Sequence, residues 1–144
     1  MKYKQFDQSY FIFIEKSEWV METLTNFCKN ANIQNGQVSG IGAVKNIELG
    51  AYDLGNKSYI RRNFGSIYEL VSFQGNITLK EGEPFIHAHI TIGNHKMEIH
   101  GGHLFEMTVA VVGEFILRSF DGKIFRKMNE EIGLPICNFP EEGL

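Results

Sequence analysis

Cysteine, proline and tryptophan are scarce in this chain of 144 residues, which contains two, three and one of them. The cysteines, Cys28 and Cys137, are far apart, and neither belongs to a CxxC or CxxH pair. This excludes a thiolate zinc site of the usual spacing. Without a secretory signal, both are expected to be buried, reduced thiols.

Targeting and membrane signals are also lacking. The first 19 residues have no apolar run followed by a small-residue cleavage site, as a secretory signal would. No apolar stretch reaches the ~18–20 residues that a membrane-spanning helix needs. The sequence therefore predicts a cytoplasmic protein with no membrane partner.

Neither sign of charge is in large excess. Fourteen basic residues stand against 17 acidic ones, which gives a formal net charge of −3. Proteins that bind the phosphate backbone of DNA usually carry a basic excess, so this balance does not favour direct DNA contact. The two compact basic pairs, Arg61–Arg62 and Arg126–Lys127, are predicted to be solvated strand ends.

What the chain does have is the pattern of one α+β domain, which we expect to span residues 1–144. After a strand over 9–16, apolar residues at helical spacing predict a helix over 18–30 with Ser17 as its N-cap. The pattern then changes to a period near two, which indicates a mainly antiparallel sheet. The further predicted strands cover 36–44, 46–54, 58–64, 67–79, 85–93, 96–102 and 107–120.

Three connections carry turn signals. Gly55–Asn56 and Asp121–Gly122 are expected at hairpin turns, the first with positive φ. Residues 126–133 are predicted to form a short second helix that Gly133 and Pro135 end.

The strand over 107–120 is apolar on both faces, which is typical of a central strand or of one buried against another subunit.

All five histidines lie within residues 84–106. In "FIHAHITI", His87 and His89 alternate with apolar residues, so they project from one face of a strand at ~6.5–7 Å Cα spacing. His103 follows two glycines, which permit a tight turn or a close backbone approach. Three neutral imidazoles with an open fourth position suit zinc, although nickel, copper or ferrous iron are chemically acceptable.

Interpretations other than a metal site stay open for the histidines and the carboxylates near them. A single histidine in a sheet is more often a hydrogen-bonded or surface residue, and His95 and His100 are expected to be of that kind. Glu98 and Glu106 are candidates to orient a ligand histidine, to act as a general base or to be surface charges. The HExxH and GxSxG motifs of known hydrolases are absent.

Four segments stand out together: "VSGIGAVKNIELGAYD", "YELVSFQGNIT", "HAHITI" and "GGHLFEMTVAVVGEF". In this order they resemble successive blocks of the PPC domain, the plant and prokaryote conserved domain, also catalogued as a domain of unknown function. The resemblance runs from about residue 9 to about residue 135. It implies an α+β fold of about seven strands flanked by a few helices, a homotrimer, and zinc held by His87, His89 and His103.

In plants this domain follows AT-hook motifs in regulators of transcription. The sequence contains no Arg-Gly-Arg-Pro arm, so it resembles the stand-alone prokaryotic type, for which a regulatory or DNA-associated role is the implied function. The alternative is a metal-dependent enzyme. In that reading zinc on three histidines lowers the pKa of bound water to about 7 and acts on a small molecule near the metal.

Overall fold

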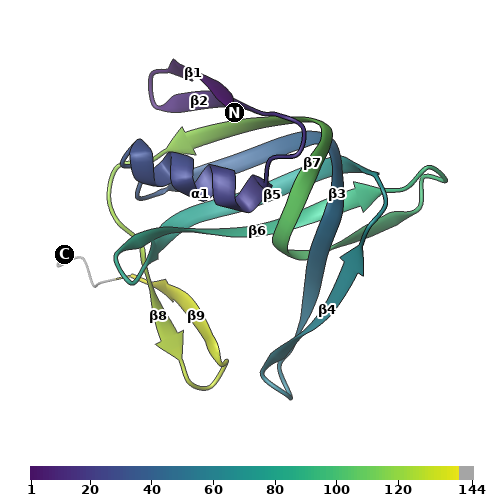
Figure 1. The fold of residues 1–144 in the computed structure, drawn as a ribbon. Coiled ribbons are helices and arrows are strands. Elements are labelled where there is room, and N and C mark those ends of the chain that lie inside the picture. The colour runs from purple at the N-terminus through teal and green to yellow at the C-terminus, as the bar shows by residue number, and fades with distance from the viewer. Residues whose placement is uncertain (140–144) are drawn as a thin grey trace.

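The computed structural model describes residues 1–139, and in them it contains one helix and nine strands (Figure 1). The helix is α1 (Val20–Asn30). The strands are β1 (Lys2–Phe6), β2 (Ser9–Ile14), β3 (Gly36–Asp53), β4 (Ser58–Phe64), β5 (Tyr68–Lys80), β6 (Glu83–Gly93), β7 (Ile99–Ser119), β8 (Phe125–Asn129) and β9 (Leu134–Asn138).

Four strands pair in a closed ring. β3 pairs with β5, β5 with β6, β6 with β7 and β7 again with β3, all antiparallel. β2 and β1 continue the sheet from β7, and β4 pairs with the second half of β3. The hairpin of β8 and β9 joins β5 through one parallel bridge between Leu79 and Phe125. The predicted α+β class and the mainly antiparallel sheet are thereby confirmed.

Two strands are longer than predicted. Residues 36–53 form one strand and residues 99–119 another, where the sequence predicts two strands in each region. Register shifts at Gly40/Gly42 and within Gly42–Leu49 bend β3 without ending it, because a β-bulge changes strand direction while pairing resumes beyond it. The structure also adds β1, which the sequence did not predict, as a charged edge strand.

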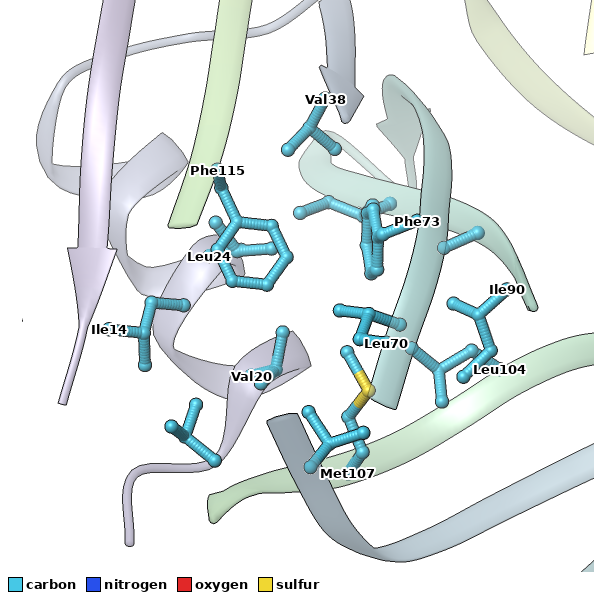
Figure 2. Close-up of a cluster of buried hydrophobic side chains, with 14 of the residues drawn as sticks. Ile14, Val20, Leu24, Val38, Leu70, Phe73, Ile90, Leu104, Met107 and Phe115 are labelled. Atoms are coloured by element: carbon cyan, nitrogen blue, oxygen red, sulfur yellow. The ribbon is translucent and has the colours of Figure 1, made fainter. Parts of the chain in front are cut away.

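The hydrophobic core lies between α1 and the ring (Figure 2). The predicted apolar face of the helix is confirmed, since Val20, Leu24, Phe27 and Cys28 are all buried. The Phe73 and Phe115 rings meet edge to face at 5.3 Å between centroids. Burial also raises the pKa of the Cys28 thiol to about 12, so this cysteine is a protonated core residue, as expected.

The start of α1 differs from the prediction. Ser17 is not the N-cap; Trp19 holds that position, and its side chain makes no capping hydrogen bond. Instead, the Glu106 carboxylate on β7 accepts hydrogen bonds from the backbone N–H groups of Met21 at 2.8 Å and Glu22 at 3.0 Å. Burial raises the pKa of Glu106, although these hydrogen bonds act in the opposite direction. A side chain distant in sequence therefore caps the helix.

Replacing Glu106 by alanine is expected to lower the free energy of unfolding by about 2 kcal/mol, because helix N–H groups lose their acceptor in a partly buried place. Urea denaturation followed by circular dichroism measures the change. Glu131, which is exposed between β8 and β9, provides a control. The free energy of unfolding of its alanine variant should lie within about 0.5 kcal/mol of the wild-type value. Equal unfolding midpoints for the two variants would contradict the capping role.

The predicted second helix is wrong. Residues 126–133 form strand β8 and a turn instead, and β9 follows. The Asn129 side chain accepts the N–H of Ile132 at 2.9 Å, and Gly133 takes a φ of 77°, which favours glycine. Pro135 sits in β9 at the sheet edge, where a missing N–H is tolerated. The prediction of a few flanking helices is therefore also corrected, because residues 1–139 contain only one helix, α1.

The two predicted hairpin turns are each partly wrong. In the connection of β3 to β4, the residue with positive φ is Lys57 (48°) rather than Gly55 or Asn56. Gly122 has a φ of 96°, but β8 beyond it pairs with β5 and β9, so Asp121–Gly122 does not close a hairpin with β7. Within residues 1–139, no helix combines the length and apolar character needed to cross a membrane.

Candidate metal centre

The three predicted ligand histidines come together on the face of the ring that points away from α1. On β6, the buried side chains of Ile86, Ala88 and Ile90 fill the core. The alternating His87 and His89 therefore project to the other face. The distances between imidazole centroids are 5.1 Å for His87–His89, 5.1 Å for His87–His103 and 5.5 Å for His89–His103.

Two glycines bring His103 to this place. Gly101 and Gly102 lie within β7, not in a turn, and β7 passes there between β6 and β3. A Cβ on Gly101 would lie 2.8 Å from the carbonyl oxygen of Ile90, and one on Gly102 would lie 2.8 Å from that of Gly50. The close backbone approach is therefore the correct interpretation of "HGGH". His103 consequently pairs directly with His89.

The nitrogens of these side chains fit a metal ion. One ligand nitrogen from each histidine lies within 4.8 Å of the other two. A tetrahedral zinc ion with bonds of about 2.0–2.1 Å needs nitrogens roughly 3.3 Å apart, which modest rotations of the rings would reach. Among residues 1–139, His103 Nδ1 is buried without a hydrogen-bond partner. A buried orphan nitrogen is costly, and a metal ion would satisfy it.

Electrostatics keep the cluster in the form that binds metals. The pKa of His103 is lowered to about 4, mainly by burial and to a smaller extent, in this order, by His87, His89, Arg61 and Arg126. Burial also lowers the pKa of His87, with Arg126 and His89 adding to the effect. At neutral pH these two imidazoles are therefore uncharged, with lone pairs available to a cation.

Aromatic side chains surround His103, and no motif in the sequence indicates this contact. The Tyr59 ring of β4 stacks on its imidazole at 4.8 Å between centroids and 27° between planes. Phe105 meets it edge to face at 4.9 Å. The Arg61 guanidinium lies 3.7 Å from the centre of the Phe105 ring and pairs with Glu48 at 2.9 Å. Arg61 is therefore part of the wall around the cluster and not only a solvated strand end.

The remaining predicted candidates lie elsewhere. His95 is exposed in the turn after β6, as expected, and His100 packs against the rings of Phe64 and Tyr68. The Glu98 carboxylate accepts a hydrogen bond from the Asn94 side chain at 2.6 Å, and Glu106 caps α1. Within the described chain, neither carboxylate orients a histidine of the cluster.

Comparison with solved structures gives close matches over nearly the whole chain. A "putative dna binding protein" from Bacteroides thetaiotaomicron is 29% identical with a TM-score of 0.93, and 96% of each chain is covered. A plant- and prokaryote-conserved (PPC) protein from Pyrococcus horikoshii is 33% identical with a TM-score of 0.85, covering 97% of this chain and 95% of that one. A metal-containing protein from Archaeoglobus fulgidus is 26% identical with a TM-score of 0.86, covering 96% and 100%.

Comparison with curated proteins finds no match. The family model of the Plants and Prokaryotes Conserved (PCC) domain, in contrast, matches residues 1–121. This match includes the ring of strands, α1 and all three histidines of the cluster. The chain therefore belongs to the Plants and Prokaryotes Conserved domain family.

Proposed function

We propose that this protein binds one zinc ion through His87, His89 and His103. The observation that carries the proposal is the convergence of three imidazoles on one point, with His103 Nδ1 buried and lacking a partner among the described residues. The name of the Archaeoglobus fulgidus relative, a metal-containing protein, supports it. Histidine nitrogen also accepts nickel, copper and ferrous iron, but three imidazoles with an open position suit zinc.

In this arrangement the chain supplies three neutral donors and a fixed geometry. Register pairing with β7 fixes His89 relative to His103, and the Tyr59 and Phe105 rings restrict the orientation of the His103 imidazole. A zinc ion bound here would supply a Lewis acid with a position open to a ligand.

The proposal is tested by adding zinc to protein stripped of metal and measuring bound metal by elemental analysis after gel filtration. We expect close to one equivalent per chain. Equal additions of nickel, copper and ferrous iron in competition identify the preferred metal. Retention of well under a tenth of an equivalent of every metal would refute the metal site.

The homotrimer is the second part of the proposal. Apolar side chains are exposed on neighbouring strands of one sheet face and, together with Ser39, Ser72, Gln74 and Glu114, line a shallow hollow of about 400 Å³. Clustered exposed apolar residues mark interaction surfaces, and three-subunit assembly is what the family resemblance implies. The patch is formed by Phe11, Ile41, Val71 and Ile116, which are 41%, 56%, 51% and 46% exposed, with Val111 beside it at 57%.

Replacing Ile116 by aspartate is expected to convert the trimer to monomers, because each interface would have to bury an unpaired carboxylate. Sedimentation velocity reports the mass of the assembly. Ile60 of β4 is 66% exposed and lies outside this patch, so its aspartate variant should remain a trimer. A wild-type protein that sediments as a monomer would contradict the assembly.

DNA association is a second candidate function, favoured by the names of the relatives from Bacteroides thetaiotaomicron and Ralstonia eutropha, both "putative" DNA-binding proteins. It predicts an affinity for duplex DNA that falls steeply as salt is raised. Fluorescence anisotropy with labelled duplex tests it, and no binding even at low salt would reject it. The metal-dependent enzyme, the cytoplasmic location and the single domain over residues 1–144 stay predictions from the sequence.

A further inference from the structure

A cavity of about 330 Å³ opens beside the histidine cluster. His87 and His103 line it, together with Lys80 at the end of β5 and residues of the β8–β9 hairpin. Two hydrogen bonds join that hairpin to the one between β3 and β4: Tyr52 Oη donates to the Ile132 carbonyl at 2.6 Å, and Lys57 Nζ donates to the Glu130 carbonyl at 2.6 Å. Figure 1 shows these two hairpins at the same end of the molecule.

The charge of the cavity is one-sided. Lys80 and Arg126 both line it, and no described carboxylate does. Their charged groups face the same ring, with Lys80 Nζ at 5.4 Å and the Arg126 guanidinium carbon at 5.2 Å from the centre of Phe85. Neither forms an ion pair with an acidic side chain in residues 1–139. This corrects the expectation that Arg126 is a solvated strand end.

Arg126 is held in place while most of its donors stay available. Its Nε donates to Thr78 Oγ1 at 2.9 Å and its Nη1 donates to the Pro135 carbonyl at 3.0 Å. A guanidinium has five N–H donors, so among the described residues three remain for a ligand. An arginine anchored in this way is preorganised to bind a carboxylate or a phosphate.

A metal ion bound by the histidine cluster would increase the excess of positive charge at the cavity. Three neutral imidazoles leave the two positive charges of a bound zinc ion uncompensated, next to two further cations. A partly buried site with such an excess of positive charge favours an anion strongly. The rest of the lining is apolar or aromatic and consists of Tyr59, Phe85, Phe105, Leu134, Pro135 and Ile136.

We propose that this cavity binds a small organic anion, with its carboxylate or phosphate held by Lys80 and Arg126 and its apolar body against Phe85 and the β9 side chains. The inference rests on the proposed metal site, because the cavity opens onto the histidine cluster. Its volume is near the lower end of the range for small-molecule sites, about 300–1,000 Å³. The ligand is therefore small, of the size of a substituted benzene ring.

The test is isothermal titration calorimetry of zinc-loaded protein with benzoate, phenyl phosphate and the uncharged benzamide. We expect at least one anion to bind, and benzamide to bind about tenfold more weakly or worse. The comparison of the two anions separates a carboxylate ligand from a phosphate ligand. Lys80→Gln and Arg126→Gln should each weaken anion binding about tenfold, since each removes one charge and keeps a polar side chain. Arg62→Gln, exposed on β4 and outside the cavity, should leave the affinity unchanged.

The zinc content of every sample is measured in parallel. If benzamide binds as well as benzoate, if both charge-removing variants bind like wild type, or if neither anion binds to protein carrying zinc, the anion site is refuted. Anion binding that depends on Lys80 and Arg126 in protein that retains no metal would instead refute the metal site alone. Should Arg126→Gln fail to fold through loss of its contacts to Thr78 and Pro135, Lys80→Gln decides.

Discussion

Replacing His103 by alanine is expected to lower the affinity for zinc by more than about 100-fold, because two imidazoles cannot enclose the ion as three do. His103 comes from β7, whereas His87 and His89 are neighbours on β6. Within the cluster, a bound ion would be linked to β7 through His103 alone. The substitution therefore removes the link between β6 and β7 through the ion. Competition with a coloured chelator measures the affinity of wild type and variant under the same conditions.

The same substitution should change the stability of metal-free protein little. It removes a buried nitrogen that lacks a partner in residues 1–139, which is favourable, and it loses the ring contacts with Tyr59 and Phe105, which is unfavourable. In the presence of zinc, wild type should gain stability by mass action and the variant should not. His95→Ala, which changes an exposed histidine of the β6–β7 turn, is the control and should bind zinc like wild type. Unchanged affinity in His103→Ala would refute the assigned ligand set.

Replacing Gly102 by valine is expected to lower the free energy of unfolding by about 3 kcal/mol and to weaken zinc binding, although every histidine is retained. The added Cβ would lie 2.8 Å from the Gly50 carbonyl oxygen. That oxygen belongs to the backbone of the paired strand, so β3 and β7 would have to move apart, as in other overpacked sites. Because His103 follows directly in β7, its imidazole would be displaced from His87 and His89.

Gly65 provides the matched control for this substitution. It lies between β4 and β5, and a Cβ added there meets no atom within 4 Å. The free energy of unfolding of Gly65→Val should therefore lie within about 0.5 kcal/mol of the wild-type value, and this variant should bind zinc normally. Urea denaturation and the chelator assay, applied to both variants, give the comparison. If Gly102→Val matched Gly65→Val in both assays, the close approach of the strands would have no role in building the site.

Local patterns were sufficient to predict much of this molecule. The alternation in "FIHAHITI" places His87 and His89 on one face whatever strand lies beside them, because it depends only on the period of a strand. The apolar face of α1 follows from helical spacing in the same way. The position of His103 beside them is different in kind. It depends on the register between β6 and β7, which pairs His89 with His103; the spacing in "HGGH" offers His103 as a candidate but does not determine this register.

The errors arise where distant residues decide the local structure. Glu106 replaces Ser17 as the cap of α1 because β7 carries it to the start of the helix, and no pattern near residue 17 indicates this. Residues 126–133 have helix-forming side chains, but pairing with β9 and contact with the end of β5 make residues 125–129 a strand, since tertiary context overrides propensity. Arg126 was misassigned for the same reason.

The closed ring of β3, β5, β6 and β7 also has a consequence for how the chain reaches this structure. β3 pairs with β7 from Gly36 opposite Ser119 to Gly50 opposite His103, so strands from opposite parts of the sequence must meet before the ring can close. Contacts so far apart along the chain carry a high loop-closure entropy, and domains dominated by them fold on the slow, millisecond-to-second scale. The hairpin of β5 and β6 is local and can form first, with His87 and His89 already side by side. The β6–β7 hairpin is local as well, and it pairs His89 with His103, so the complete cluster can form before β3 pairs with β7 and closes the ring.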